Sequence, residues 1–129
     1  MFIWPHGVDV DRDGNIWVTD AVGSARIPEG DKRGHQVVKF SPTGEVLMRL
    51  GTPGVAGDGP YSFNAPSDVA VAENGDVFIA DGHNDKGNNR VMKYSKDGEF
   101  IKSWGRTGWA PGEVKDASLT GRNPSPASG

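Results

Sequence analysis

An internal repeat constrains this sequence of 129 residues more than any other feature. Residues 5–20, PHGVDVDRDGNIWVTD, align with residues 66–81, PSDVAVAENGDVFIAD, and residues 37–51 align with residues 91–105 in the same order. Only the loop between the two halves differs in length. Two matched halves in one order indicate a single structural unit that occurs twice.

Each unit has the pattern of four short β-strands. Val8 and Val10 alternate with aspartates, and this period of two is typical of a half-buried strand. Asp13-Gly14 predicts a tight turn after them, because glycine accepts the positive φ that hairpin turns require. Nineteen glycines and nine prolines leave little room for helices. The strands expected in the first unit lie around residues 8–10, 16–19, 36–40 and 45–50, and the second unit repeats them.

A four-stranded antiparallel unit that recurs along the chain is typical of a β-propeller blade. We therefore predict an all-β chain with blade 1 over residues 1–51, a crossover loop over residues 52–65 and blade 2 over residues 66–105. Residues 106–129 would then be the start of a missing blade and a disordered tail. Because a blade buries its faces only against neighbouring blades, we expect a fragment of a larger closed ring. Its partners would be the remaining blades or copies of itself. A small eight-stranded barrel or sandwich is the alternative, but it does not explain the duplicated segments.

The topology of such blades gathers the long loops on one side. Strand two returns to the face where strand one starts, so the connection to strand three and the crossover to the next blade also lie there. We call this the loop face, which carries His6 and residues 20–35, 51–66 and 82–90. The short turns lie on the opposite side, the turn face. Long polar loops on a rigid scaffold are common places for binding and catalysis.

The composition excludes several classes of function. A formal net charge of −3 gives no electrostatic attraction to nucleic acid. No run of about 18 apolar residues is present, so the sequence predicts no membrane span. The absence of cysteine excludes disulfides and thiolate metal sites. The first residues lack the basic region and apolar stretch of a signal peptide, and the compartment stays open.

These segments, continued by HQVVKFSPTGEV and by DGHNDKGNNRVMKYSKDGEFIKSWG, resemble NHL-repeat proteins. More narrowly, residues 4–114 resemble the peptidyl-α-hydroxyglycine α-amidating lyases and their bacterial relatives. The resemblance implies a six-bladed propeller with zinc on its axis, held by three histidines from three blades, and a structural calcium nearby. It implies a carbon–nitrogen lyase that releases a peptide amide and glyoxylate. Because bacterial relatives are often exported, it also implies an extracellular or periplasmic location.

The resemblance assigns roles to three positions. His6, in PHG at the head of a first strand, matches a zinc ligand of the family. Val8 matches the position whose backbone carbonyl binds calcium. His83 stands where the family has a tyrosine thought to act in proton transfer or substrate alignment. The equivalent of His6 in blade 2 is Ser67, and the family draws no zinc ligand from that blade. Since the other two ligand histidines and an active-site arginine should come from other blades, we expect this chain alone to be inactive.

The residues themselves leave plainer interpretations open. His6 can be a structural or exposed histidine, and His83 can be a metal ligand, a general acid or base, or a solvated loop residue. Arg90 is a candidate for binding an anionic substrate group, and His35 is interpreted as structural. At the level of the whole chain, a non-catalytic NHL propeller that binds a protein, peptide or glycan is the alternative to a lyase.

Two acidic patterns also have structural interpretations. Asp20 and Asp81 end equivalent strands, and we expect them to accept backbone N–H groups rather than to act in catalysis. The spacing of Asp11, Asp13 and Asn15 is similar to that of a calcium loop, but the later ligands are missing. A turn that joins two strands is the simpler interpretation.

Overall fold

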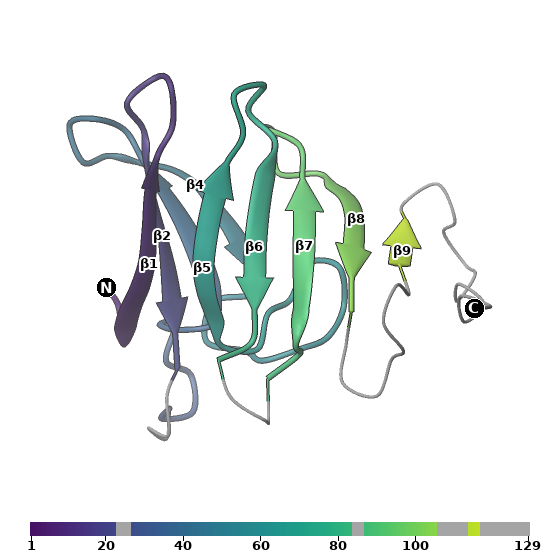
Figure 1. Ribbon diagram of the computed structural model, residues 1–129. Coiled ribbons are helices and arrows are strands. Elements are labelled where there is room, and N and C mark those ends of the chain that lie inside the picture. The colour runs from purple at the N-terminus through teal and green to yellow at the C-terminus, as the bar shows by residue number, and fades with distance from the viewer. Residues whose placement is uncertain (23–26, 84–86, 106–113, 117–129) are drawn as a thin grey trace.

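In the part of the chain that the structure describes, β-strands are the regular secondary structure. The computed structural model describes residues 1–22, 27–83, 87–105 and 114–116 (Figure 1). Within these residues there is no helix long and apolar enough to cross a membrane. The strands are β1 (Trp4–Val10), β2 (Ile16–Ala21), β3 (Gln36–Phe40), β4 (Val46–Gly51), β5 (Pro66–Val71), β6 (Val77–Asp81), β7 (Arg90–Tyr94), β8 (Phe100–Trp104) and β9 (Val114–Asp116).

The strands form two antiparallel sheets in chain order, as predicted for two blades. The first sheet has the order β1-β2-β3-β4, and the second has the order β5-β6-β7-β8-β9. The second sheet therefore has one strand more than the four predicted. β9 pairs with β8 through residues 114–116, where the sequence predicts that the next blade begins. This pairing covers the backbone groups that β8 would otherwise present as an edge strand. The rest of the prediction for residues 106–129 lies outside the described residues.

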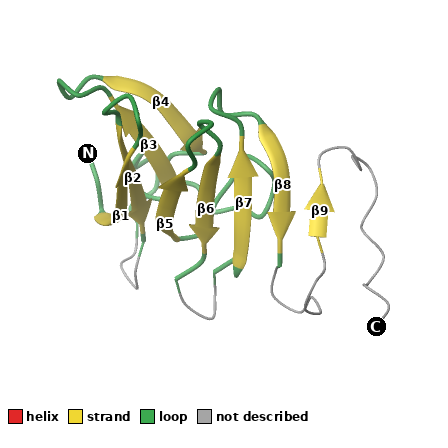
Figure 2. Ribbon diagram, turned by 45° about the horizontal axis from the view of Figure 1, so that its top comes forward, coloured by secondary structure: helices red, strands yellow, loops and turns green. Residues whose placement is uncertain are grey.

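The core lies between the two sheets, which face each other across it (Figure 2). Each sheet contributes the side chains of one face, and the crossover loop adds Phe63, which is completely buried. The ring of Phe63 lies 6.0 Å from that of Tyr94 and fills the space above Gly51, where a Cβ would meet it at 2.6 Å. The buried members of this core are Trp17, Val37, Leu50, Phe63, Val69, Val77, Ile79, Met92 and Tyr94.

The DRDGN segment is a turn, as its simpler interpretation predicts. The Asp11 carboxylate accepts the backbone N–H groups of Asp13 at 2.9 Å and Asn15 at 3.0 Å, and the indole N–H of Trp17 at 3.1 Å. Gly14 has φ +82°. The acidic residues here satisfy the backbone of the turn and one buried indole.

The predicted separation of long loops from short turns is confirmed. Figure 1 shows the β1–β2, β3–β4, β5–β6 and β7–β8 turns at the upper end of the sheets. The described parts of the connections β2–β3, β4–β5 and β6–β7 lie at the lower end, where β1 and β5 begin. The loop face is therefore one side of the molecule.

Candidate active site on the loop face

Asp20 anchors the N-terminal segment and the β2–β3 loop to the end of β2. It is completely buried, and its Oδ1 accepts the N–H groups of Ile3 and Trp4, each at 2.9 Å. Its Oδ2 accepts the N–H of Gly34 at 2.7 Å and the Gln36 amide at 3.3 Å. The predicted structural role is confirmed, because the carboxylate holds Trp4 at the loop face through its backbone.

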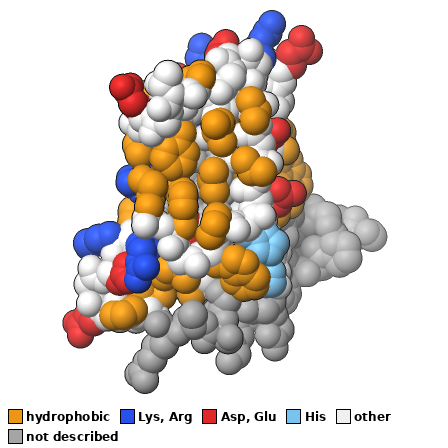
Figure 3. Space-filling view, turned by 90° about the vertical axis from the view of Figure 1, so that its left-hand side faces the viewer, with side chains coloured by type: hydrophobic (Ala, Val, Ile, Leu, Met, Phe, Trp, Pro, Cys, Tyr) orange, Lys and Arg blue, Asp and Glu red, His pale blue; other side chains and the backbone are white. Residues whose placement is uncertain are grey.

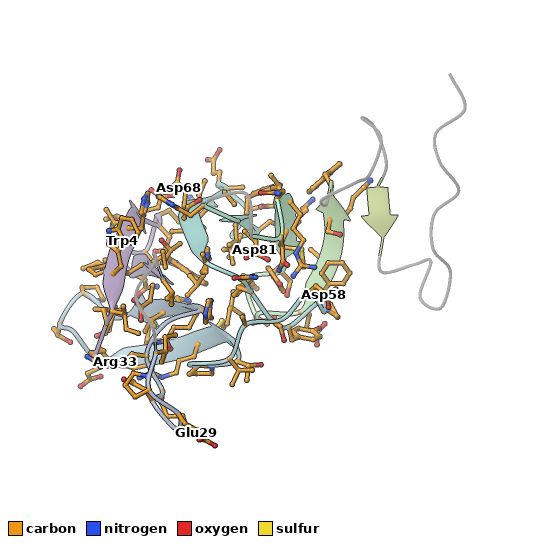
Figure 4. The ribbon with its side chains drawn as sticks, turned by 90° about the horizontal axis from the view of Figure 1, so that it is seen from below. Trp4, Glu29, Arg33, Asp58, Asp68 and Asp81 are labelled. Atoms are coloured by element: carbon orange, nitrogen blue, oxygen red, sulfur yellow. The ribbon has the colours of Figure 1, made fainter. Side chains whose placement is uncertain are left out.

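Asp81 repeats this arrangement at the end of β6. Its Oδ1 accepts the N–H of Asn64 at 2.8 Å, which is the repeat equivalent of the Ile3 contact. Its Oδ2 accepts the Asn88 amide at 2.7 Å and Nε of Arg90 at 2.9 Å. The Asp81 side chain is fully buried, so this carboxylate is also structural. Figure 4 looks onto the loop face, with Asp81 between Trp4 on the side of β1 and Asp58 on the side of β8.

Arg90 uses its guanidinium group within the protein. Its Nη1 donates to the carbonyl of Asp58 at 2.6 Å, and its Nη2 donates to those of Gly59 and Ser62, each at 2.8 Å. Together with Asp81, these acceptors fix the crossover loop to β7, and only 8% of the Arg90 side chain is exposed. The substrate-binding role stays a prediction, and the contacts give Arg90 a structural one.

His35 is a structural histidine, as interpreted from the sequence. It is 7% exposed, and its Nδ1 accepts the backbone N–H of Ala65 at 3.0 Å. This bond fixes blade 1 to the end of the crossover loop and requires an unprotonated Nδ1. Burial lowers the pKa of His35 from its usual 6.5, although the nearby Asp20 charge acts in the other direction.

A β-bulge in β1 carries His6. Pro5 pairs with Asp20 and Val8 pairs with Val18, so the segment between them has one residue more than its partner strand. A bulge of this kind redirects a side chain, and bulges are frequent next to active sites. The sequence indicates the strand but not this irregularity.

Gly7 lets the bulge lie directly against blade 2. A Cβ on Gly7 would meet the Cα of Asp68 at 2.7 Å and the carbonyl of Ser67 at 2.8 Å. This close approach brings Nδ1 of His6 to 2.8 Å from the same Ser67 carbonyl. A carbonyl only accepts, so Nδ1 carries the proton, and in the neutral imidazole the lone pair lies on Nε2. The His6 ring is thus oriented by the neighbouring blade.

Ser67 also holds the loop that carries His83. Its Oγ donates to the carbonyl of Gly82 at 3.0 Å, next to His83 in the chain. One residue therefore contacts both parts of the candidate site, by its carbonyl and by its hydroxyl. The sequence identifies Ser67 only as a position without a metal ligand, and no motif indicates its positioning role.

The structure brings His6, His83 and Trp4 together into one cluster, which we call the histidine pair with its tryptophan. The His6 and His83 ring centroids are 4.5 Å apart at an interplanar angle of 73°. The Trp4 ring lies 5.2 Å from His6 and 4.8 Å from His83. All three side chains are exposed, so a ligand can reach them. Among the described residues, no three His, Cys, Asp or Glu side chains gather to hold a metal ion.

Two blades that share a loop face, with this cluster at their junction, define the class: the chain is a piece of a β-propeller. The NHL repeat model matches residues 2–27 and 63–94, which include β1 with His6 and β5 to β7 with His83. The chain therefore contains NHL repeats, and its two sheets are propeller blades.

The relatives are more specific. The chain is 40% identical over 109 residues to peptidyl-alpha-hydroxyglycine alpha-amidating lyase 1 of Drosophila melanogaster. This alignment covers 82% of this chain and 17% of that protein. It is 39% identical over 102 residues to a probable lyase of the same name from Caenorhabditis elegans, covering 78% and 25%. It is 36% identical over 113 residues to human NHL repeat-containing protein 3, covering 83% and 30%. The chain thus spans less than a third of each of these relatives.

Proposed function

We propose that the chain supplies two consecutive blades to a six-bladed propeller that acts as a peptidyl-α-hydroxyglycine α-amidating lyase. This reaction cleaves a carbon–nitrogen bond and releases a peptide amide and glyoxylate. The observation that carries the proposal is the exposed His6 on the loop face, with Nδ1 fixed by the Ser67 carbonyl. Its support from outside the chain is the similarity to amidating lyases over about four fifths of its length.

The two outer sheet faces support a larger ring. Val8 is 64% exposed, but its repeat equivalent Val69 is 3% exposed within the core. On the far side of blade 2, Val91 is 40% exposed, while its equivalent Val37 is fully buried. Figure 3 shows the apolar side chains spread over the β1 side of the molecule. Since each exposed face repeats one that is buried between the blades, further blades of the same kind fit both faces.

One residue of this chain, His6, fits the role of a zinc ligand in such a site. His6 offers an exposed imidazole whose Nδ1–H is hydrogen-bonded to a carbonyl, the arrangement that orients metal-binding histidines. Zinc, when bound, supplies a Lewis acid that polarises an oxygen of the substrate. His83, in ring contact with His6, can accept or donate a proton beside that position. Calcium would be held through the backbone carbonyl of Val8, two residues beyond His6.

A non-catalytic binding module is the second candidate. Human NHL repeat-containing protein 3 is about as similar to this chain as the lyases are. His83 also departs from the tyrosine of the lyases at that position. In this case the loop face would bind a protein, peptide or glycan, and His6 would be one contact among several. We expect the 129-residue chain alone to be inactive, because it supplies one of the three histidines that the lyases use.

The test is glyoxylate release from an α-hydroxyglycine peptide by the longest protein that contains this chain, with zinc and calcium added. We expect activity, and we expect His6→Ala to lower it by at least about 100-fold, since even outer-shell partners of metal ligands are worth 10–100-fold. Arg33→Met is the matched surface control and should keep full activity, because 48% of this side chain is exposed. If the unsubstituted protein releases no glyoxylate, the lyase proposal is wrong and the binding module is favoured.

A further inference from the structure

We propose that His6 and His83 together bind one divalent transition-metal ion, so that His83 is a metal ligand and not only a proton-transfer group. The proposal deepens the function proposed above, because the ion occupies the position given there to zinc. It differs in the ligand set, because two imidazoles of this chain, those of His6 and His83, bind the same ion. It is therefore testable on the chain without further blades.

The separation of the two rings fits a shared ion. With metal–nitrogen bonds of about 2.0–2.1 Å, two imidazoles that meet at a right or tetrahedral angle have ring centroids roughly 4.5–5.2 Å apart. The observed separation of His6 and His83 is 4.5 Å. The rings now meet edge to face at 73°, so binding would require the exposed His83 ring to turn until one of its nitrogens points to the same position as Nε2 of His6.

The available nitrogens also fit. Nδ1 of His6 is engaged by the Ser67 carbonyl, which leaves Nε2 as the metal-binding atom. Within the described residues, the ring of His83 makes contacts with Trp4 and His6 and no hydrogen bond. Imidazole nitrogen suits zinc, nickel and copper and does not suit magnesium or calcium. The expected metal ion is therefore zinc, nickel or copper. Water would complete the coordination in the isolated chain.

Ser67 makes the site pre-organised. Its carbonyl fixes His6, and its hydroxyl holds the Gly82 carbonyl beside His83. The backbone carbonyl is present whatever the side chain, so Ser67→Ala frees only the loop of His83. We therefore infer that Ser67 is a positioning residue for the second ligand.

The experiment is calorimetric titration of Zn²⁺ into the full 129-residue chain at pH 7.5, compared with His6→Asn, His83→Asn and His83→Tyr. We expect each of the three variants to weaken Zn²⁺ binding by at least about tenfold, the lower end of the loss found for outer-shell partners. The tyrosine variant separates the two roles of His83. It keeps a proton-transfer group, but its phenol, with a pKa of about 10, stays neutral and is a poor ligand.

A second readout uses the tryptophan beside the pair. Trp4 lies within 5.2 Å of both rings, so Ni²⁺ bound there should quench part of the tryptophan fluorescence. Trp4→Phe should remove this quenching and leave the Zn²⁺ affinity within about twofold, since the indole is no ligand. Ser67→Ala should weaken Zn²⁺ binding less than His83→Asn does. Circular dichroism is the check that each variant is folded.

The outcomes are distinct from those of the lyase test. Unchanged Zn²⁺ affinity in His83→Asn, with a loss in His6→Asn, overturns the shared site and leaves the lyase proposal standing. Unchanged affinity in both variants also overturns it, because the ion then binds elsewhere. Equal losses in both variants support the pair, even where the longer protein releases no glyoxylate.

Discussion

Replacing Arg90 by methionine tests whether this residue serves the fold or a substrate. The substitution keeps most of the apolar stem and removes the donors to Asp81 and to the carbonyls of Asp58, Gly59 and Ser62. The Asp81 carboxylate would remain buried without its cation. Removal of one partner from a buried ion pair costs about 3–5 kcal/mol. Against a typical domain stability of about 5–15 kcal/mol, this is a large fraction.

The assay is urea unfolding of the unsubstituted chain and of Arg90→Met, followed by tryptophan fluorescence. With an m-value of about 1–3 kcal/mol/M, the midpoint should fall by at least about 1 M. Arg33→Met is the control, because its ion pair with Asp31 lies at the surface and its loss should leave the midpoint in place. An unchanged midpoint for Arg90→Met would refute the structural role and return Arg90 to the substrate-binding candidates.

Three further predictions concern other contacts of the loop face. His35 is neutral in the fold and its pKa is lowered, so the unfolded chain binds more protons and stability should fall as the pH drops below about 6.5. We chose His35→Asn as the test because the repeat has Asn89 at the equivalent position. In a plot of the urea midpoint against pH, this variant should show a smaller fall below about pH 6.5. Gly7→Ala should cost about 1–3 kcal/mol in thermal unfolding, because the methyl group would meet the backbone of Asp68. Asp20→Ala should lower the free energy of unfolding by about 2–5 kcal/mol, because several N–H groups lose their acceptor, and an effect below about 1 kcal/mol would contradict this account.

Most of the fold follows from period and turn chemistry in the sequence. The alternation of Val8 and Val10 and the glycine turns specify the strands, and the strand predicted over residues 36–40 has the bounds observed for β3. The repeat then specifies two sheets of the same order. β9 could not be predicted from the sequence, because its three residues lie in a polar segment without the apolar–polar alternation of a strand. Its pairing depends on the open edge of β8, which is a tertiary feature.

The candidate site is predictable in its residues but not in its geometry. His6 and His83 lie far apart in the sequence, and topology places both on the loop face without showing that their rings touch. That contact depends on the bulge after Pro5 and on the absence of a side chain at Gly7. The contacts of Arg90 are also not predictable from the sequence. A cation in a polar loop suggests an exposed group, whereas its partners are carbonyls of a crossover loop distant in the sequence.

The repeat also explains how the site can differ between equivalent positions without loss of the scaffold. Asp20 and Asp81 hold the same two segments in each blade, one with the neutral Gln36 and the other with Arg90. Near the start of the first strand, however, one blade has His6 and the next has Ser67. The His6 ring donates a hydrogen bond to the carbonyl of Ser67, its repeat equivalent. The side chain of one residue is oriented by the backbone of its counterpart. A blade junction can therefore acquire a functional side chain through one substitution, because the neighbouring repeat already presents the carbonyl that orients it.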